Sequence, residues 1–300
     1  MIRMVNIMKN IVKFLEYEAR IINATARVHA LKKKKACPTK LGDVVGEKVL
    51  IVGNGPSVND IDLTLLRKKR PDIEICCVNY FPSKYSKFYE LKPEYLCLIN
   101  PRFFMDDNDV PVENRTERKI MYDCLEKVTW DMTIVTMQSF HKKVINNSHI
   151  KILYIADNTI PYNDLFSKKI LNVYKRNLAN CGGQNVVIVA GFFFTLMKYK
   201  EIYIAGIDMD EYQCYRINED NHIILRTKHF YGIREIDLVE NNLWSEGSFY
   251  KLLASYQRTF EQFYYLAKFA NDNNVKIYNL TLNSFVDVFS KVNIEDIINA

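Results

Sequence analysis

The sequence predicts an α/β protein, a single Rossmann-like domain with a doubly wound, largely parallel sheet. Two observations carry this prediction. Short apolar runs that resemble buried strands alternate with helical patterns from residue 48 onward. The first of these runs ends in a Gly-rich turn that leads into a helix start. The 300 residues, 48% of them hydrophobic, are enough for one large domain with a sizeable core.

The predicted strands are short runs rich in Val, Ile, Leu and Tyr, which is typical of strands covered on both faces. They are residues 49–52, 74–79, 95–100, 132–137, 151–155, 201–206 and 275–280. The predicted helices have apolar residues at helical spacing. They are residues 63–69, 115–125, 184–198, 249–271 and 284–299. We therefore expect the domain to cover residues 48–300.

Residues 211–244 differ from the rest of this domain. They are rich in Tyr, Asn, Asp, Arg and His and show no clear periodicity. A long irregular stretch inside an α/β domain is more often a functional lid than a simple connection. We therefore predict an irregular lid here.

Residues 1–47 are predicted to form an amphipathic helix followed by a linker. Apolar residues recur at roughly helical spacing through residues 2–22, basic residues accompany them, and residues 32–35 are all lysine. Pro38, Gly42 and Gly46 mark the linker. Two interpretations stay open: residues 1–35 lie on an anionic membrane surface, or the helix packs on the core or on another subunit of a homo-oligomer.

Composition narrows the class of protein. The formal net charge of +6 is too small for a dedicated nucleic-acid binder, and it suits anionic substrates or an anionic membrane face. Seven cysteines without a C-x-x-C pair indicate free thiols in a reducing cytoplasm and no zinc site. No 18-residue apolar run and no signal-peptide pattern occur. We expect a cytoplasmic protein, peripheral on the inner face of the membrane if the helix binds there.

The Gly-rich turn is the strongest local signal of a ligand site. A strand that passes through such a turn into a helix start gathers backbone N–H groups, and the helix dipole favours negative charge. The pattern is neither the dinucleotide fingerprint nor the P-loop, so an ordinary strand-turn-helix joint is the competing interpretation. The residues of interest are Gly53, Asn54, Gly55 and Ser57.

Two further asparagines end apolar runs. Asn79 and Asn100 each follow a predicted strand, and amide side chains both donate and accept hydrogen bonds. Ligands of open α/β sheets bind outside the carboxyl ends of the strands, so these residues and Asn54 could surround a nucleotide. The competing interpretation is that asparagine commonly starts turns.

Two more segments could contribute to the same site. Gly182 and Gly183 precede an apolar helix, where they serve either close approach to a ligand or helix–sheet packing. Asp208 and Asp210 follow the strand at residues 201–206 and could hold a divalent metal that bridges a nucleotide diphosphate, although so short a motif often arises by chance.

His229 is the candidate general base among the five histidines. It lies within the predicted lid, and an imidazole titrates near neutral pH, as a base for an acceptor hydroxyl should. The competing interpretation is a surface or packing histidine.

Together these residues resemble the bacterial sialyltransferases of glycosyltransferase family 42, which modify cell-surface oligosaccharides such as those of lipopolysaccharide or capsule. The resemblance covers about residues 48–290, with a divergent middle. It is carried by the Gly-Asn-Gly-Pro-Ser turn at residues 53–57, Asn79, residues 100–104, residues 199–208 with their Gly-Ile-Asp end, and residues 283–284.

The resemblance implies a transferase with one Rossmann-like domain and a lid, which needs no metal or cofactor. Its donor substrate would be a CMP-activated acidic sugar, the acceptor an oligosaccharide or glycolipid, and transfer would invert the anomeric centre. Asn54, Asn79 and Asn100 would contact the nucleotide. Tyr212 and Tyr215 in the lid would stabilise the departing phosphate.

The chain departs from the family in the histidine motif. The family has His-Tyr-x-Gly-His with the second histidine as base, whereas this chain has Ile233 at that position and keeps only His229. Either His229 takes the role through a local shift, or the chemistry differs.

Two other functions remain open. A metal-dependent transferase would use a nucleotide diphosphate-sugar on Asp208 and Asp210 and would be sensitive to EDTA. A non-catalytic assembly protein that retains the fold would bind no nucleotide. A nucleic-acid partner is not expected, because the basic residues do not form one stripe interleaved with aromatics.

Overall fold

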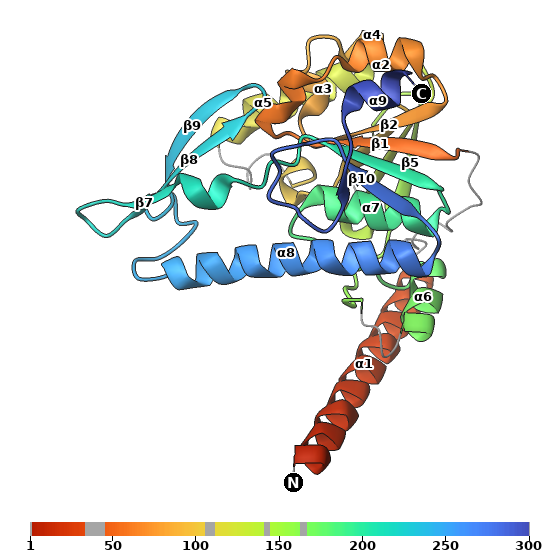
Figure 1. The fold of residues 1–300 in the computed structure, drawn as a ribbon, viewed down its shortest axis with the longest axis vertical. Coiled ribbons are helices and arrows are strands. Elements are labelled where there is room, and N and C mark those ends of the chain that lie inside the picture. Colours follow the sequence, from red (N-terminus) through yellow and green to blue (C-terminus); the bar gives the residue numbers. More distant parts are fainter. Residues whose placement is uncertain (1, 34–45, 106–111, 141–144, 163–166, 300) are drawn as a thin grey trace.

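A computed structural model describes residues 2–33, 46–105, 112–140, 145–162 and 167–299. Its centre is an eight-stranded sheet with the order β11-β10-β6-β1-β2-β3-β4-β5, in which every neighbouring pair is parallel (Figure 1). The strands are β1 (Lys48–Val52), β2 (Ile73–Val78), β3 (Tyr95–Leu98), β4 (Met132–Met137), β5 (Ile150–Ile155), β6 (Glu201–Ala205), β10 (Lys276–Asn279) and β11 (Ser290–Lys291). The predicted α/β, doubly wound class is confirmed.

Helices cover both faces of this sheet (Figure 1). Successive side chains of a strand point to opposite faces, so Val49 and Ile51 of β1 belong to one hydrophobic cluster and Leu50 and Val52 to the other. The first cluster includes residues of α6 (Ser167–Lys175), α7 (Val186–Leu196) and α8 (Phe249–Asp272). The second includes residues of α2 (Leu63–Lys69), α3 (Phe81–Lys84), α4 (Phe88–Leu91), α5 (Val112–Glu126) and α9 (Ile294–Asn299).

All seven predicted strands are present, but the predicted helix at residues 284–299 is wrong. Residues 281–289 form a loop, followed by the short β11 and by α9. Hydroxyl groups stabilise this loop: the Ser284 hydroxyl donates to the carbonyl of Ile207 and accepts from the N–H of Val286 at 3.0 Å. Such side chain to backbone bonds compete with helix formation.

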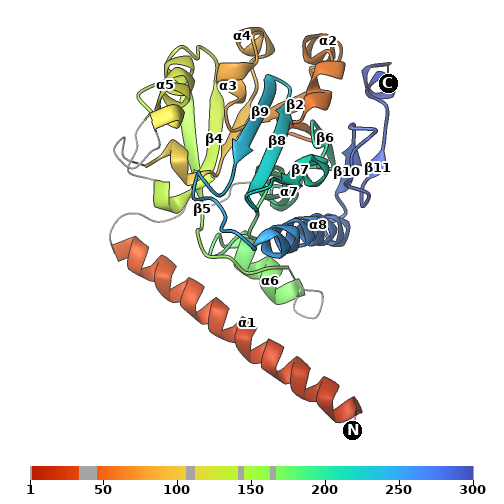
Figure 2. The ribbon, with the colours of Figure 1, turned by 90° about the vertical axis from the view of Figure 1, so that its left-hand side faces the viewer.

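The predicted irregular lid is also corrected, because most of it forms a second, antiparallel sheet beside the first (Figure 2). After a short 3-10 turn, η6 (Glu211–Cys214), come β7 (Tyr215–Ile217), β8 (Ile223–His229) and β9 (Gly232–Asp237). Ile223 and Leu238 pack with Leu252 of α8 in a separate small cluster. Strand periodicity is hard to see in the sequence because β9 is mostly exposed and carries one isoleucine and at least one charged residue on each face.

The predicted N-terminal helix is α1 (Ile2–Lys33), which extends away from the body of the protein (Figures 1 and 2). The linker expected at Pro38 and Gly42 lies outside the described residues. None of the described helices has both the length and the apolar content needed to cross a bilayer.

Candidate functional site

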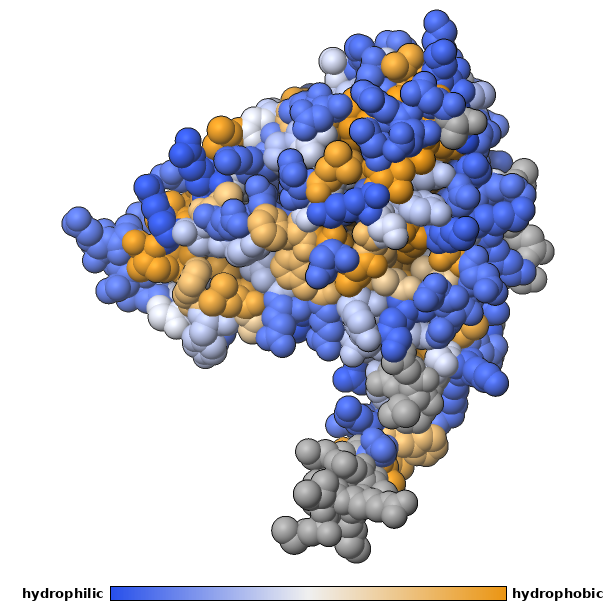
Figure 3. Space-filling model, viewed as in Figure 1, coloured by the Kyte–Doolittle hydropathy of each residue, from blue (hydrophilic) through white to orange (hydrophobic). Residues whose placement is uncertain are grey.

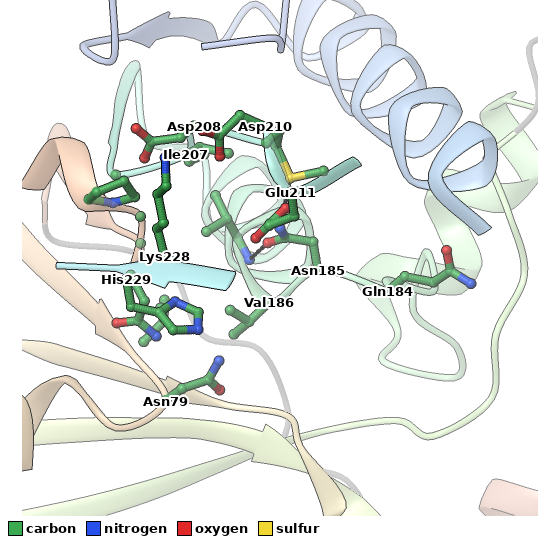
Figure 4. A pocket seen from close by; sticks show the side chains of 18 residues that line it. Asn79, Gln184, Asn185, Val186, Ile207, Asp208, Asp210, Glu211, Lys228 and His229 are labelled. Atoms are coloured by element: carbon green, nitrogen blue, oxygen red, sulfur yellow. Dashed lines mark hydrogen bonds between the residues drawn. The ribbon is translucent and has the colours of Figure 1, made fainter. Parts of the chain in front are cut away.

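A cavity of about 210 Å³ lies where the strand order of the main sheet reverses. From β1 the chain builds β2 to β5 on one side, then returns to place β6 on the other side of β1. The cavity is at the carboxyl ends of these strands, where open α/β sheets bind their ligands. Figure 4 shows its lining side chains, which come mainly from the segments that follow β1, β2 and β6, from the start of α7 and from β8.

Glycines bring the turns after β1 and β6 into direct contact. The N–H of Gly53 donates to the carbonyl of Ala205 at 2.8 Å, and that of Gly55 donates to Gly206 at 2.9 Å. A Cβ on Gly53 would lie 2.4 Å from the Gly206 carbonyl oxygen, and one on Gly55 would lie 1.8 Å from a carboxylate oxygen of Asp208. The glycines therefore form the floor of the cavity by permitting this close approach.

Asn54 and Asn79 both line the cavity, and the side-chain oxygen (Oδ1) of each is buried without a hydrogen bond to any described residue. Asn79 has a left-handed backbone with φ 51°, and its side chain lies below His229 in the cavity (Figure 4). An unpaired buried acceptor is costly unless a ligand satisfies it.

The N-terminus of α7 forms another wall. Asn185 is the N-cap, and its Oδ1 accepts from the N–H of Val187 at 2.9 Å. Gly182 and Gly183 do not line the cavity. Gly182 has φ +72° beside Thr159, and a Cβ on Gly183 would lie 2.5 Å from Cγ2 of Val189, so these two glycines serve packing and the turn before α7.

Asp208 lines the cavity and is held by Ser57, in the 3-10 turn η1 (Pro56–Asp60). The Ser57 hydroxyl donates to the Asp208 carboxylate at 2.9 Å, and its N–H donates at 3.3 Å. Burial raises the pKa of Asp208, and the nearby charge of Asp210 raises it further. Burial likewise raises the pKa of Glu211, a third carboxylate at the cavity wall.

The two aspartates do not form a converging metal site in the described part of the chain. In that part of the chain, one group has metal-ligand atoms that converge within 4.8 Å of one another. It consists of His222, Asp237 and Glu240. That group lies at one end of the small sheet, where His222 precedes β8 and Asp237 ends β9, and it does not line the cavity.

His229 ends β8 and is half-buried at the cavity. Burial lowers its pKa, and a hydrogen bond with the Asn54 backbone partly opposes that shift. Its ring stacks on Tyr231 with centroids 5.0 Å apart, and its Nε2 lies 3.4 Å from Oγ1 of Thr227. The next residue, Phe230, donates its N–H to the Asn54 carbonyl at 3.2 Å, which joins the small sheet to the Gly turn.

Lys228 is a cavity residue that sequence reasoning did not single out. It points from β8 toward Asp208, whereas His229 points from the opposite face of the strand toward Asn79 (Figure 4). Its neighbour His229 stood out in the sequence as a candidate base, but only the position of β8 at the cavity shows that Lys228 lines it too.

Besides Gly182 and Gly183, four predicted site residues do not line the cavity: Ser57, which holds Asp208, and Asn100, Tyr212 and Tyr215. Asn100 caps the 3-10 turn η2 (Pro101–Phe103), accepting from the N–H of Arg102 at 3.0 Å. The Tyr215 hydroxyl lies 2.8 Å from that of Tyr256 and lines a neighbouring cavity of about 330 Å³. The Tyr212 ring packs on Phe285 at 5.1 Å.

No model of a known protein family matches this sequence, and a search of curated proteins also finds no match. Among solved structures, the chain is similar to the Maf glycosyltransferase from Magnetospirillum magneticum AMB-1, with a TM-score of 0.49 and 11% identity over 85% of this chain. It spans only 35% of that protein's length.

The chain is also similar to the sialyltransferase CstII from Campylobacter jejuni, solved in complex with cytidine-5'-monophosphate. The TM-score is 0.38, with 17% identity over 82% of this chain and 84% of CstII. Both neighbours are glycosyltransferases. Because both TM-scores lie below 0.5, we assign roles from the residues of this chain's own cavity.

Proposed function

We propose that this chain is a glycosyltransferase that moves an acidic sugar, sialic acid or a relative, from a CMP-activated donor to an oligosaccharide or glycolipid acceptor. One observation supports this above the others: one cavity, at the point where the strand order reverses, contains the Gly turn, a helix N-terminus and a half-buried histidine. It also contains two asparagines whose side-chain oxygens have no hydrogen-bond partner among the described residues. The sequence motifs of the Gly turn and the Gly-Ile-Asp strand end agree with it.

The asparagines are suited to the nucleoside. Cytosine has an exocyclic amino group and ribose has two hydroxyls, and each of these can donate a hydrogen bond. Asn54 and Asn79 present two buried acceptors that have no partner among the described residues. A bound nucleoside would satisfy them, which makes these amides selective for a ligand that carries donors.

The phosphate is assigned to the N-terminus of α7 and to Lys228. A helix N-terminus favours an anion, and a lysine adds a full positive charge. CMP leaves as a monophosphate, so it needs less neutralisation than a diphosphate and no metal is required. Tyr212 and Tyr215 lie outside the cavity. We therefore assign the stabilisation of the leaving phosphate to the N-terminus of α7 and to Lys228 instead of these tyrosines.

His229 is assigned as the general base. Burial lowers its pKa, so the imidazole is neutral at neutral pH and can accept a proton. In the reaction the acceptor hydroxyl oxygen attacks the anomeric carbon from the face opposite the phosphate. Its proton passes to His229, the bond between the anomeric carbon and the phosphate oxygen breaks, and CMP departs with that electron pair. This order of events inverts the anomeric centre.

The metal-dependent alternative, a nucleotide diphosphate-sugar held through Asp208 and Asp210, has less support. The Asp208 carboxylate is already engaged by Ser57, and its pKa is raised rather than lowered. A carboxylate must be ionised to bind a divalent metal, and a low pKa keeps it ionised.

Thermal unfolding with CMP, CDP, UDP and GDP, each with magnesium or with EDTA, tests the proposal. A ligand at about 100 times its Kd stabilises the folded state by about 2.7 kcal/mol, which raises Tm by several degrees. We expect CMP to stabilise the protein equally in EDTA. Stabilisation by a diphosphate only with magnesium would move the assignment to the aspartates, and no stabilisation by any nucleotide would favour the non-catalytic assembly protein.

A CMP-release assay with CMP-sialic acid then tests catalysis. Hydrolysis of the donor in the absence of acceptor would identify the sugar, and addition of a glycan acceptor should raise the rate. Binding of CMP without release from any acidic sugar donor would leave a nucleotide-binding protein and contradict the transferase.

A further inference from the structure

The N-terminal helix α1 has two apolar stripes on opposite faces, and only one of them is covered by the protein. Residues two apart in a helix point about 200° apart, so Leu15 and Tyr17 lie on opposite sides. The body-facing stripe has the spacing 17, 21, 24, 28, and the outward stripe has the spacing 8, 11, 12, 15, 22. Each stripe therefore needs its own explanation.

The body-facing stripe attaches α1 to the domain. Ala24 and Val28 are buried in the main core, and Tyr17 donates its hydroxyl to the Pro161 carbonyl at 3.1 Å. Glu18 pairs with Lys169 of α6. These contacts anchor the second half of the helix, while its first half extends beyond the body (Figures 1 and 2).

The outward stripe is exposed to solvent. Five large apolar side chains lie on it, and each exposes about half of its surface or more: Met8, Ile11, Val12, Leu15 and Ile22. Figure 3 shows a small apolar area on the part of this helix below the body. Exposed apolar surface of this kind, continuous along about 20 Å of helix, marks an interaction site.

The charge of α1 indicates which of two partners, a second copy of the helix or an anionic bilayer, covers this outward stripe. The helix contains seven lysines and arginines and two glutamates, a formal charge of +5 out of +6 for the whole chain. A second copy of α1 packed on the same stripe would bring two such helices together, and like charges repel. An anionic bilayer instead offers apolar acyl chains for the stripe and negative headgroups for the cations of the helix.

We propose that α1 docks this protein on an anionic lipid bilayer, with the outward stripe lying in the interface plane. The helix does not span the bilayer; its apolar face enters the boundary between headgroups and acyl chains. The domain remains attached to the docked helix through the body-facing stripe. This binding is independent of the proposed enzymatic activity.

Vesicle flotation of the full chain tests this. We compare vesicles of phosphatidylcholine alone with vesicles of equal parts phosphatidylcholine and phosphatidylglycerol, for the wild type and for the double variant Ile11→Asp, Leu15→Asp. The control variant is Leu65→Asp, an exposed leucine on α2. Both changes are at exposed positions, and circular dichroism and Tm check that the fold persists.

The wild type and Leu65→Asp should float with the anionic vesicles, and the double variant should lose at least about tenfold in binding. Binding should also weaken as salt screens the cations. Equal flotation of the double variant, or no flotation of the wild type, would overturn the proposal. So would a wild-type dimer in sedimentation equilibrium that the double variant converts to monomer, because a second copy would then cover the stripe.

Discussion

Gly53 and Gly206 directly follow two adjacent parallel strands, β1 and β6, and lie so close together that a Cβ on Gly53 would be 2.4 Å from the Gly206 carbonyl oxygen. This contact fixes the distance between the turns after β1 and β6, and the cavity lies directly on these turns. The neighbouring N–H of Gly55 donates to the same carbonyl group at 2.9 Å. The close approach therefore determines both the stability and the shape of the site.

Gly53→Ala should destabilise the protein and weaken CMP binding. The new methyl group meets backbone rather than a flexible side chain, so relief requires the two turns to separate, at a cost of about 1–3 kcal/mol. Urea unfolding and CMP titration measure the two effects. The control is Gly247→Ala. No described atom lies within 4 Å of a Cβ at this position, but φ is +67°, so backbone strain alone costs about 1–2 kcal/mol. If Gly53→Ala left CMP affinity unchanged, the turn would not shape the site.

Asn79→Gly should weaken CMP binding about tenfold without loss of stability. The left-handed backbone at φ 51° suits glycine, so the change removes the amide and leaves the turn intact. One hydrogen bond with good geometry contributes about 0.5–1.5 kcal/mol. The matched control is Asn274→Gly, at φ 58° beyond the C-terminus of α8, which should change neither binding nor Tm. Isothermal titration with CMP measures the difference, and equal affinity of the two variants would remove Asn79 from the site.

Asn79 and Asn100 show how far the sequence alone could predict the site. Both end an apolar run, and both could be predicted to face a ligand. Asn100 precedes a proline, and its side chain caps the 3-10 turn that the proline starts, whereas Asn79 adopts a left-handed backbone and lines the cavity. The sequence pattern located the strand ends, but the local turn decided which amide is available.

The main sheet was predictable for a simple physical reason. Parallel strands buried on both faces are nearly continuous apolar runs, which stand out in the sequence. The small antiparallel sheet was not predicted, because β9 is exposed and its pairing with β8 depends on register across a turn. Lys228 could not be recognised for the same reason, since its place at the cavity depends on where this sheet packs.

Lys228→Met should weaken CMP binding by about ten- to a hundredfold, because a charged hydrogen bond to a phosphate contributes about 1.5–3 kcal/mol. The flexible apolar side chain of methionine preserves the length of the lysine stem. Arg226→Met is the control: it removes a positive charge from the same face of β8, two residues away, and Arg226 does not line the cavity. Cytidine without phosphate should bind wild type and Lys228→Met equally. Equal weakening of cytidine would show that Lys228 supports the fold of the site and does not bind the phosphate.

His229→Ala should lower kcat by about a hundredfold or more while CMP affinity stays near that of the wild type, because a general base acts on the acceptor and not on the nucleotide. His222→Ala provides the control. That histidine directly precedes β8, its Nδ1 lies 2.8 Å from the Asp237 carboxylate, and it does not line the cavity, so its removal should leave kcat unchanged. An unaltered kcat in His229→Ala would exclude His229 from the chemistry.

The pH dependence of both activity and stability follows from the lowered pKa of His229. A base must be unprotonated, so kcat/KM should rise with pH and level off, with its acid limb centred below pH 6.5, the ordinary pKa of histidine.

The stability of the fold should depend on pH for the same reason, because the unfolded chain binds a proton at His229 more readily than the folded chain does. The contribution of the buried neutral ring is therefore complete above pH 6.5 and is lost as pH falls toward the lower folded pKa. Rate profiles and urea unfolding between pH 5 and pH 8 measure both, for the wild type and for His229→Gln, which cannot titrate. In His229→Gln, the residual kcat/KM should no longer fall at acidic pH, and the free energy of unfolding should lose the decrease that His229 causes below pH 6.5. If the acid limb and this decrease both persisted unchanged, another group would be responsible for them.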